Sequence, residues 1–288
     1  MTPCCPDDAR QGRSCVGLPG PAPVLRRALL AAPALLLARG ARAAEWRGEP
    51  AQGGFLVGRA EPGTRLALDG RTLRVGPSGE FAFGFSRDHG PRATLAVAPQ
   101  SGRAETRSLD VRRREWDVQH ITGLPPAQVT PDEAALRRIL AERERLALAR
   151  AVDSALTEFA APLAWPARGR ISGIFGSQRV LNGQPRQPHY GLDVAGPVGT
   201  PINAALAGKV TLSGDFFFFG QLLVIDHGHG VNTLYAHLSE RLVAEGETVA
   251  RGQLVAKMGA TGRVTGPHLH FSLSWYQVWL DPQPLLAA

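Results

Sequence analysis

Residues 266–273 read Gly-Pro-His-Leu-His-Phe-Ser-Leu, and this stretch decides the fold. Polar and apolar side chains alternate along it, which predicts a β-strand because successive side chains of a strand point to opposite faces. His268 and His270 then lie on one face, and Leu269 and Phe271 lie on the other. The C-terminal part of the chain is therefore predicted to be β-rich, with two imidazoles close together on one strand.

Another histidine and a carboxylate occur in residues 188–194, which read Pro-His-Tyr-Gly-Leu-Asp-Val. Pro188 and Gly191 argue against a helix, so an extended segment is expected. Residues four apart in an extended segment share a face, so His189 and Asp193 can offer a nitrogen and an oxygen to one cation. One further histidine would give zinc three protein ligands and an open position, the arrangement in which zinc generates hydroxide at neutral pH.

Some of these side chains have a second interpretation. A lone His-x-His pair is equally compatible with histidines that are satisfied inside a core. His227 and His229 alternate with glycines in an expected turn between two strands, so they are interpreted as structural or groove-edge residues. The run Phe216–Phe219 is compatible with a hairpin that walls a substrate groove and equally with a contribution to the core.

A third histidine motif, Tyr235-Ala236-His237-Leu238, completes a pattern that covers about residues 165–284. The whole pattern resembles the lysostaphin-type, LytM-domain zinc metalloendopeptidases. The supporting phrases are Ile174-Phe175-Gly176, Gly199-Thr200-Pro201, Gly208-Lys209-Val210, Asp226-His227-Gly228, Gly246-Glu247-Thr248-Val249, Gly259-Ala260-Thr261-Gly262 and Thr265-Gly266-Pro267-His268.

The resemblance implies a role for each motif. His189, Asp193 and His270 would hold one Zn2+ per chain, and His237 and His268 would be the catalytic histidines. These two would stand beside the activated water, draw off its proton and donate hydrogen bonds to the oxyanion. Because histidine must be neutral to bind metal, activity is expected to fall as the pH approaches the ordinary imidazole pKa of about 6.5.

The resemblance also implies the substrate class. We expect a hydrolase that cuts the peptide cross-links of bacterial peptidoglycan, and a D-Ala to diaminopimelate endopeptidase rather than a glycyl-glycine one, because no wall-binding domain follows. Relatives that have lost metal ligands activate cell-wall amidases by binding, so a non-catalytic activator is the alternative. All five expected positions are filled here, which favours the enzyme. A regulatory or activator protein is a further candidate partner.

The formal charge of +7 raises the question of a nucleic-acid partner. Residues 1–43 carry six Arg and two Asp, a net charge of +4, which leaves +3 for residues 44–288. A nucleic-acid-binding module would also leave the histidine pattern unexplained, and the chain lacks an aromatic-basic stripe. The sequence therefore argues against nucleic acid.

Residues 1–43 are predicted to be a signal peptide that is removed before Ala44. Arg26 and Arg27 precede an apolar run too short to span a bilayer, and Ala41-Arg42-Ala43 has the small-x-small form of a cleavage site. All three cysteines lie before this point, so the mature chain would contain no thiol. We expect an exported, periplasmic protein with no stable membrane span, by either the Sec or the twin-arginine route.

The rest of the chain has three expected parts, which make the fold class mainly β. Residues 44–113 show a period of two with turns at Asp69-Gly70 and at residues 76–79, which predicts a small immunoglobulin-like β-sandwich, more simply a spacer or lid than a glycan-binding module. Residues 114–164 are expected to be a linker with a helix over about 131–159, capped by Thr130. Residues 165–288 are expected to form an antiparallel β LytM-type peptidase domain.

Overall fold

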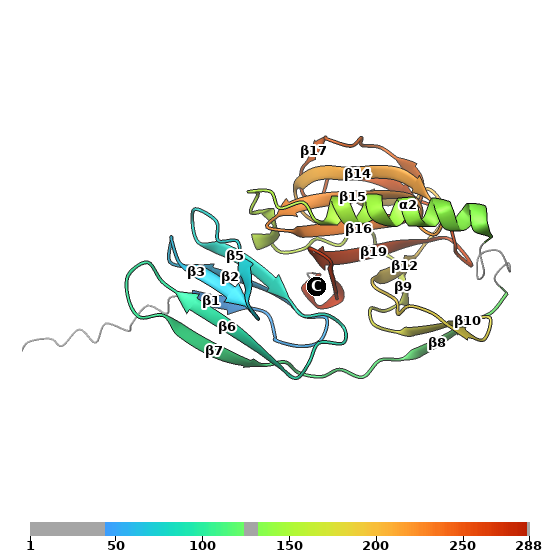
Figure 1. Ribbon diagram of the computed structural model, residues 1–288. Coiled ribbons are helices and arrows are strands. Elements are labelled where there is room, and N and C mark those ends of the chain that lie inside the picture. The colour runs from blue at the N-terminus through green and yellow to red at the C-terminus, as the bar shows by residue number, and fades with distance from the viewer. Residues whose placement is uncertain (1–43, 124–131, 287–288) are drawn as a thin grey trace, which may run out of the picture. The chain divides into compact units, whose positions relative to one another are not determined.

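The computed structural model describes residues 44–123 and 132–286 and is mainly β, as predicted (Figure 1). The predicted signal peptide, with its three cysteines, lies outside the described residues. The described part of the chain contains no helix long and apolar enough to cross a membrane. The described residues fall within one compact unit, so the predicted division into a sandwich domain and a peptidase domain stays a prediction.

The N-terminal strands form two small sheets that share a core. The sheets have the orders β1-β2-β5 and β4-β3-β6-β7. Phe81, Phe83 and Leu95 are completely buried between them. Asp69 and Gly70 both have positive φ, 47° and 82°, as a two-residue turn between antiparallel strands requires, so the predicted hairpin is confirmed. The immunoglobulin-like relationship stays a prediction. The strands are β1 (Ala44–Arg47), β2 (Phe55–Ala60), β3 (Arg65–Leu68), β4 (Arg71–Leu73), β5 (Glu80–Gly84), β6 (Arg92–Ala98) and β7 (Glu105–Asp110).

A ten-stranded sheet dominates the C-terminal part, and all its strand pairs are antiparallel. Its main path runs β17-β14-β15-β16-β19-β12-β9, with β13, β18 and β20 paired beside it. Its strands are β9 (Arg170–Gly173), β12 (Leu192–Ala195), β13 (Pro201–Asn203), β14 (Gly208–Phe216), β15 (Gly220–Gly228), β16 (Val231–Arg241), β17 (Thr248–Val249), β18 (Leu254–Met258), β19 (His268–Trp275) and β20 (Val278–Leu280).

Two hydrophobic clusters lie on this sheet. Leu269 and Phe271 of β19 belong to the larger cluster, with Tyr235, Leu192 and Val194. The predicted alternation of β19 is thus confirmed, because its apolar side chains enter this core while His268 and His270 lie on the opposite face of the strand. Helix α2 (Glu133–Arg150) lies across β14–β16 (Figure 1) and adds Leu146 and Ala149 to a smaller cluster.

Helix α2 differs from the predicted helix at both ends. Its N-cap is Asp132, whose carboxylate accepts the Ala135 N–H at 2.8 Å; the predicted cap, Thr130, lies outside the described residues. The helix ends at Arg150 rather than near 159, because the following residues turn to contact the β15–β16 hairpin. There the Ser154 carbonyl accepts the N–H of His229 at 3.0 Å. Only a 3-10 turn, η1 (Glu158–Ala160), follows, and a second, η2 (Gln283–Leu285), lies near the C-terminus.

Helix α2 does not bury all of its apolar side chains. Leu136 and Leu140 are 47% and 61% exposed, whereas Ile139, Leu146 and Ala149 are buried. The sheet beneath the helix selects which face is covered, and that choice depends on contacts distant in sequence.

The predicted linker contains a strand. β8 (Val118–Ile121) pairs in parallel with β10 (Gln178–Leu181), which also pairs with the short β11 (Gln184–Pro185). The four residues of β8 pair with residues about 60 positions further along the chain, so no local sequence pattern predicts this strand. Just before β8, Trp116 packs edge-on to Phe175, with ring centroids 5.8 Å apart.

Candidate metal centre

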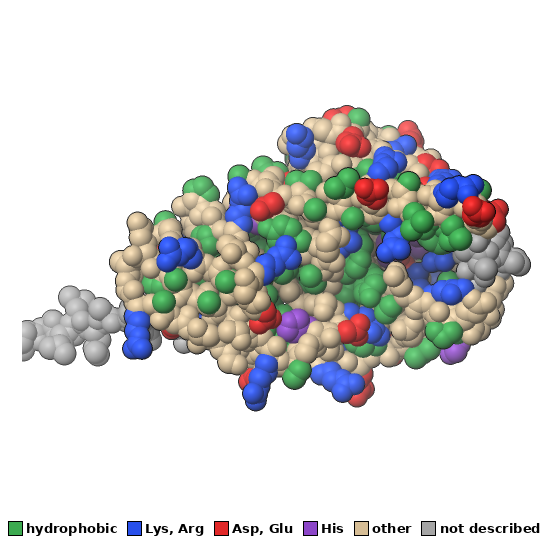
Figure 2. Space-filling view, in the orientation of Figure 1, with side chains coloured by type: hydrophobic (Ala, Val, Ile, Leu, Met, Phe, Trp, Pro, Cys, Tyr) green, Lys and Arg blue, Asp and Glu red, His purple; other side chains and the backbone are tan. Residues whose placement is uncertain are grey.

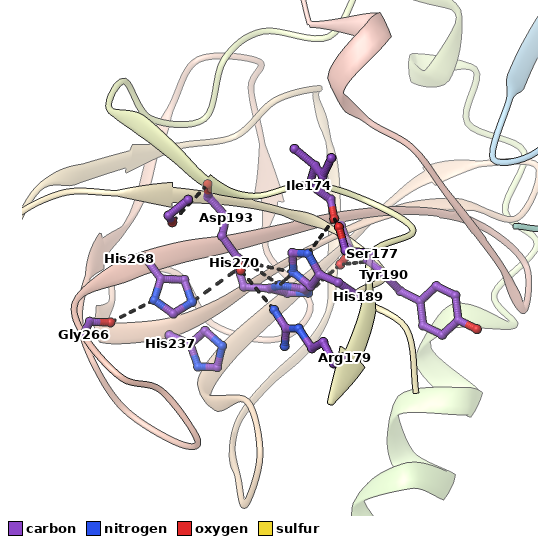
Figure 3. Close-up of polar contacts among 12 residues, drawn as sticks. Ile174, Ser177, Arg179, His189, Tyr190, Asp193, His237, Gly266, His268 and His270 are labelled. Carbon is purple, nitrogen blue, oxygen red and sulfur yellow. Dashed lines mark hydrogen bonds and ion pairs between the residues drawn. The ribbon is translucent and has the colours of Figure 1, made fainter. Parts of the chain in front are cut away.

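The register between β12 and β19 places Asp193 directly opposite His270. Opposed residues of antiparallel strands have neighbouring Cβ atoms, so both side chains enter the same space. Asp193 Oδ1 lies 2.8 Å from His270 Nδ1 and 2.9 Å from His189 Nε2, and the two nitrogens are 3.0 Å apart (Figure 3). The three predicted ligands are therefore brought together, and all three are buried.

His189 reaches this position from a loop rather than from the strand that carries Asp193. The prediction of one extended segment is wrong in this respect, because β12 begins only at Leu192. The backbone of His189 instead pairs with residues 176 and 177: its N–H donates to the Ser177 carbonyl at 2.8 Å and its carbonyl accepts the Gly176 N–H at 2.7 Å. This pairing holds the imidazole above the end of β12.

Each of the two imidazoles is oriented by a partner on its outer nitrogen. His189 Nδ1 lies 3.0 Å from the Ile174 carbonyl, so Nδ1–H donates outward and Nε2 presents a lone pair to the cluster. His270 is held in the opposite sense. Its Nε2 lies 2.8 Å from Ser272 Oγ, which in turn donates to the Tyr190 carbonyl at 2.6 Å, so Nδ1 faces the cluster. Such partners fix the tautomer that a metal needs.

His237 enters the site through a bulge in β16. The register with β15 shifts between Leu223 and Gln221, and His237 has a φ of 63°, in the left-handed region. A non-glycine residue held there costs about 1–3 kcal/mol, and such strain concentrates at functional sites. Its Nδ1 lies 2.9 Å from the Thr261 carbonyl, which leaves Nε2 as the free nitrogen.

His268 completes the group from the first position of β19. Its Nδ1 lies 2.8 Å from the Gly266 carbonyl, and its Nε2 lies 3.9 Å from Asp193 Oδ1. The rings of His268 and His237 are 4.8 Å apart between centroids, and those of His237 and His270 are 5.9 Å apart. Four imidazoles thus lie close together, each with one nitrogen paired to an oxygen outside the group, and the other nitrogens of His189 and His270 contact Asp193 Oδ1.

Two glycines make room for the cluster. A Cβ on Gly191 would stand 2.7 Å from His270 Cε1, and a Cβ on Gly173 would stand 2.5 Å from Asp193 Oδ2. Neither contact is compatible with the observed side-chain positions. The absence of a side chain at Gly173 and Gly191 therefore leaves the room that Asp193 and His270 occupy.

The chain is similar in sequence to known peptidases. Residues 187–282 match Peptidase family M23. The peptidoglycan DD-endopeptidase ShyA of Vibrio cholerae is 44% identical over 105 residues, 36% of this chain and 24% of ShyA. The DD-carboxypeptidase/endopeptidase Mpg of Neisseria meningitidis is 40% identical over 116 residues, 40% of this chain and 26% of Mpg. The chain thus spans about a quarter of the length of these curated relatives.

A crystal structure of a Pseudomonas aeruginosa protein assigned to peptidase M23 covers much more. It is 30% identical, aligns with 83% of this chain and 95% of its own, and has a TM-score of 0.63. The chain belongs to peptidase family M23. The resemblance to lysostaphin-type peptidases is thereby confirmed, and the matched residues carry the whole histidine cluster.

His227 and His229 of this M23 domain lie away from the three-ligand group and are buried. His227 is buried, with Nδ1 2.7 Å from the Ala207 carbonyl and Nε2 2.8 Å from Thr233 Oγ1. His229 is buried against Phe159, with ring centroids 4.8 Å apart. Neither belongs to the three-ligand group.

The aromatic run Phe216–Phe219 contributes to the core, and its interpretation as the wall of a substrate groove stays a prediction. Phe216 is buried in the cluster beneath α2, whereas the ring of Phe219 lies 6.0 Å from that of His270. The Glu142 carboxylate of α2 accepts the Phe217 N–H at 2.8 Å and so anchors the run. The helix thereby contacts the segment that carries Phe219 beside His270.

Sequence reasoning missed several residues that orient the cluster. Arg179 of β10 donates from Nη2 to Asp193 Oδ2 at 3.1 Å (Figure 3), and Ser272 and the Thr261 carbonyl orient His270 and His237. The position of Ser272, two residues beyond His270 on the same strand face, is a signal that could have found it. No local sequence pattern indicates Arg179, because β11 and an irregular loop separate β10 from β12.

Burial controls the charge of the cluster. It lowers the pKa of His270 to about 4, and with the positive charges of His270 and His268 it lowers the pKa of His237 to about 3. Burial alone would raise the pKa of Asp193, but His189 and His270 outweigh it and hold that pKa well below its ordinary value. At neutral pH His270 and His237 are therefore neutral and Asp193 is ionised, so that His270 and Asp193 are in the ionisation states that bind metal.

Gly191→Ala is expected to weaken Zn2+ affinity about tenfold to a hundredfold, because the new methyl group displaces His270 from the cluster. Competition with a chromophoric chelator measures the affinity. Gly90→Ala is the matched control, since no heavy atom lies within 4 Å of its added Cβ, and it should bind as the wild type does. Unchanged affinity in Gly191→Ala would contradict the proposed position of His270.

The metal-free protein should keep His270 and His237 neutral well below the ordinary imidazole pKa. Nitrogen-15 NMR of the rings should show midpoints near 4 and 3, so that any acid loss of their function occurs below the value expected from sequence. Because the unfolded chain takes up these protons near pH 6.5, the two groups should lower stability as pH falls from about 6.5 toward 4. Midpoints between 6 and 7 would show that the rings are solvated.

Proposed function

We propose that the protein is a zinc-dependent endopeptidase that hydrolyses D-Ala to diaminopimelate cross-links of bacterial peptidoglycan. The observation that carries the proposal is the convergence of His189 Nε2, His270 Nδ1 and Asp193 Oδ1 within about 3 Å of one another, beside two further imidazoles. Membership of family M23 supports peptidase activity, and the names of ShyA and Mpg support the choice of bond.

The donor set fits zinc. Two nitrogens and one carboxylate oxygen are ligands that Zn2+ prefers, and with bonds of about 2.0–2.1 Å a tetrahedral ion separates neighbouring ligand atoms by roughly 3.3 Å. The observed 2.8–3.0 Å separations need only a small expansion. Zinc held there by His189, Asp193 and His270 would supply a Lewis acid that activates water and polarises the scissile carbonyl.

His237 and His268 would handle protons in this reaction. Each has its Nδ1–H committed to a backbone carbonyl, so the free Nε2 can accept a proton from the attacking water. Once protonated, the same nitrogen can donate a hydrogen bond to the oxyanion and then a proton to the leaving amine. Burial lowers the pKa of His237 and so makes it a weak proton acceptor.

A non-catalytic amidase activator would require none of this. It could fold without the paired outer nitrogens, without the strained backbone at His237 and without the glycines that open the cluster. The retention of all of these features supports the enzyme. We further propose that residues 1–43 direct export and that the protein acts in the periplasm, where peptidoglycan is found.

His270→Ala and His237→Ala should separate metal binding from catalysis. His270→Ala is expected to lose bound zinc and activity together, because it removes a direct ligand; His237→Ala should keep zinc but lose hydrolysis by about a hundredfold or more. Metal content by elemental analysis is measured beside activity. His89→Ala, in the loop between β5 and β6, is the control and should change neither. Loss of zinc in His237→Ala, or its retention in His270→Ala, would contradict the assigned roles.

The function itself is tested by digestion of labelled sacculi with the purified chain lacking residues 1–43. We expect soluble fragments, loss of activity with a chelator and recovery with added zinc. Mass spectrometry should show new D-Ala carboxyl ends and free diaminopimelate amines, whereas new glycine ends would overturn the choice of bond. Absence of cleavage together with stimulation of a purified amidase would instead support the activator.

A further inference from the structure

We propose that Glu142 of α2 is a positioning residue for the proposed catalytic histidine His237, on which it acts through the turn of residues 217–219. This inference rests on the proposed function and deepens it, because it names an element outside the histidine cluster that sets the geometry of the reaction. Family M23 matches residues 187–282, so the match assigns no role to α2.

Glu142 differs from the other acidic side chains of α2. Glu133 and Glu144 are exposed, on a surface where Figure 2 shows acidic, basic and hydrophobic side chains interspersed along the helix. Glu142 is only 9% exposed, and both of its carboxylate oxygens have a partner. Oε1 accepts the Arg138 Nε–H at 2.5 Å, and Oε2 accepts the Phe217 N–H at 2.8 Å. Because an ionised acceptor binds an N–H more strongly than a neutral one does, this contact fastens the turn to the helix.

The turn has little in its own sequence to define its conformation. It joins β14 to β15 and consists of Phe217, Phe218 and Phe219. Glycine, proline, asparagine, aspartate and serine favour turns, and none of them occupies these three positions. All three side chains are partly exposed, so burial also holds the turn only in part. Contacts with other elements therefore decide how the turn is shaped.

The carbonyls of this turn reach the segments that hold His237. The Phe219 carbonyl accepts the His237 N–H at 2.8 Å, and the Phe218 carbonyl accepts the Arg263 N–H at 2.9 Å. Two residues before Arg263, the Thr261 carbonyl lies 2.9 Å from His237 Nδ1. The turn thus contacts both the backbone of His237 and the segment that orients its ring.

The backbone of His237 depends on such support. Its φ of 63° is in the left-handed region, and a strained residue of this kind persists only where the surrounding contacts hold it. A displacement of a catalytic group by about 1 Å can slow a reaction about a hundredfold. The metal ligands are held by other segments, the β12–β19 pair and residues 176–177. Loss of the Glu142 contact should therefore slow the reaction and leave zinc bound.

Glu142→Ala should lower kcat on a soluble cross-linked peptide dimer about tenfold or more, with KM within about twofold of the wild-type value. Glu142→Gln keeps an oxygen that accepts the Phe217 N–H and should recover part of the loss. Glu133→Ala is the matched control, because it also removes an ion pair with an arginine four positions away on α2, but at an exposed site; it should leave kcat unchanged. Zinc content and thermal unfolding are measured for every variant.

Hydrogen exchange of the backbone amides detects the coupling directly. In Glu142→Ala the His237 amide should exchange about tenfold or more faster than in the wild type, whereas the amide of Thr233, in the same strand, should keep its rate. A side chain that only stabilised the whole fold would change both amides alike when it is removed.

Wild-type kcat in Glu142→Ala, or a wild-type exchange rate of the His237 amide in that variant, would overturn the proposal. Loss of zinc from Glu142→Ala would overturn it as well, because the effect would then extend to the metal ligands. If the zinc-loaded wild type cleaves neither the peptide dimer nor sacculi, the proposed function fails, and hydrogen exchange alone decides whether Glu142 holds His237.

Discussion

The antiparallel register of β12 and β19, which sets Asp193 opposite His270, is the constraint on which the site depends. If β19 slipped by one residue, His270 would turn to the opposite face, and Leu269 and Phe271 would leave the core. The hydrophobic cluster beneath β19 therefore enforces the geometry above it. Burial of apolar side chains in this cluster stabilises the register and so fixes the positions of Asp193 and His270.

Around this strand pair, the chain holds each imidazole by its outer nitrogen. The acceptors are the carbonyls of Ile174, Thr261 and Gly266 and the hydroxyl of Ser272. These contacts engage one nitrogen of each ring and leave the other nitrogens of His189 and His270 facing Asp193 Oδ1. Two imidazole nitrogens and a carboxylate oxygen brought together in this way are consistent with a site shaped for a cation.

The sequence predicted the strand of His268 and His270, the hairpin at Asp69-Gly70 and the grouping of His189, Asp193 and His270, since each is carried by a local pattern or a motif. It failed where distant contacts decide. Helix α2 ends at Arg150 because the next residues contact the β15–β16 hairpin, and β8 exists only through its pairing with β10. For the same reason Arg179, which contacts Asp193 across a loop, could not be foreseen.

The central claim is that one metal ion is held by two imidazoles and a carboxylate. Anomalous diffraction at the zinc edge, from crystals grown without chelator, tests it most directly. The account predicts one strong peak bonded to His189 Nε2, His270 Nδ1 and an Asp193 carboxylate oxygen, with Zn–N distances of about 2.0–2.1 Å. No peak among these atoms in zinc-supplemented crystals, or a peak held by other residues, would contradict it.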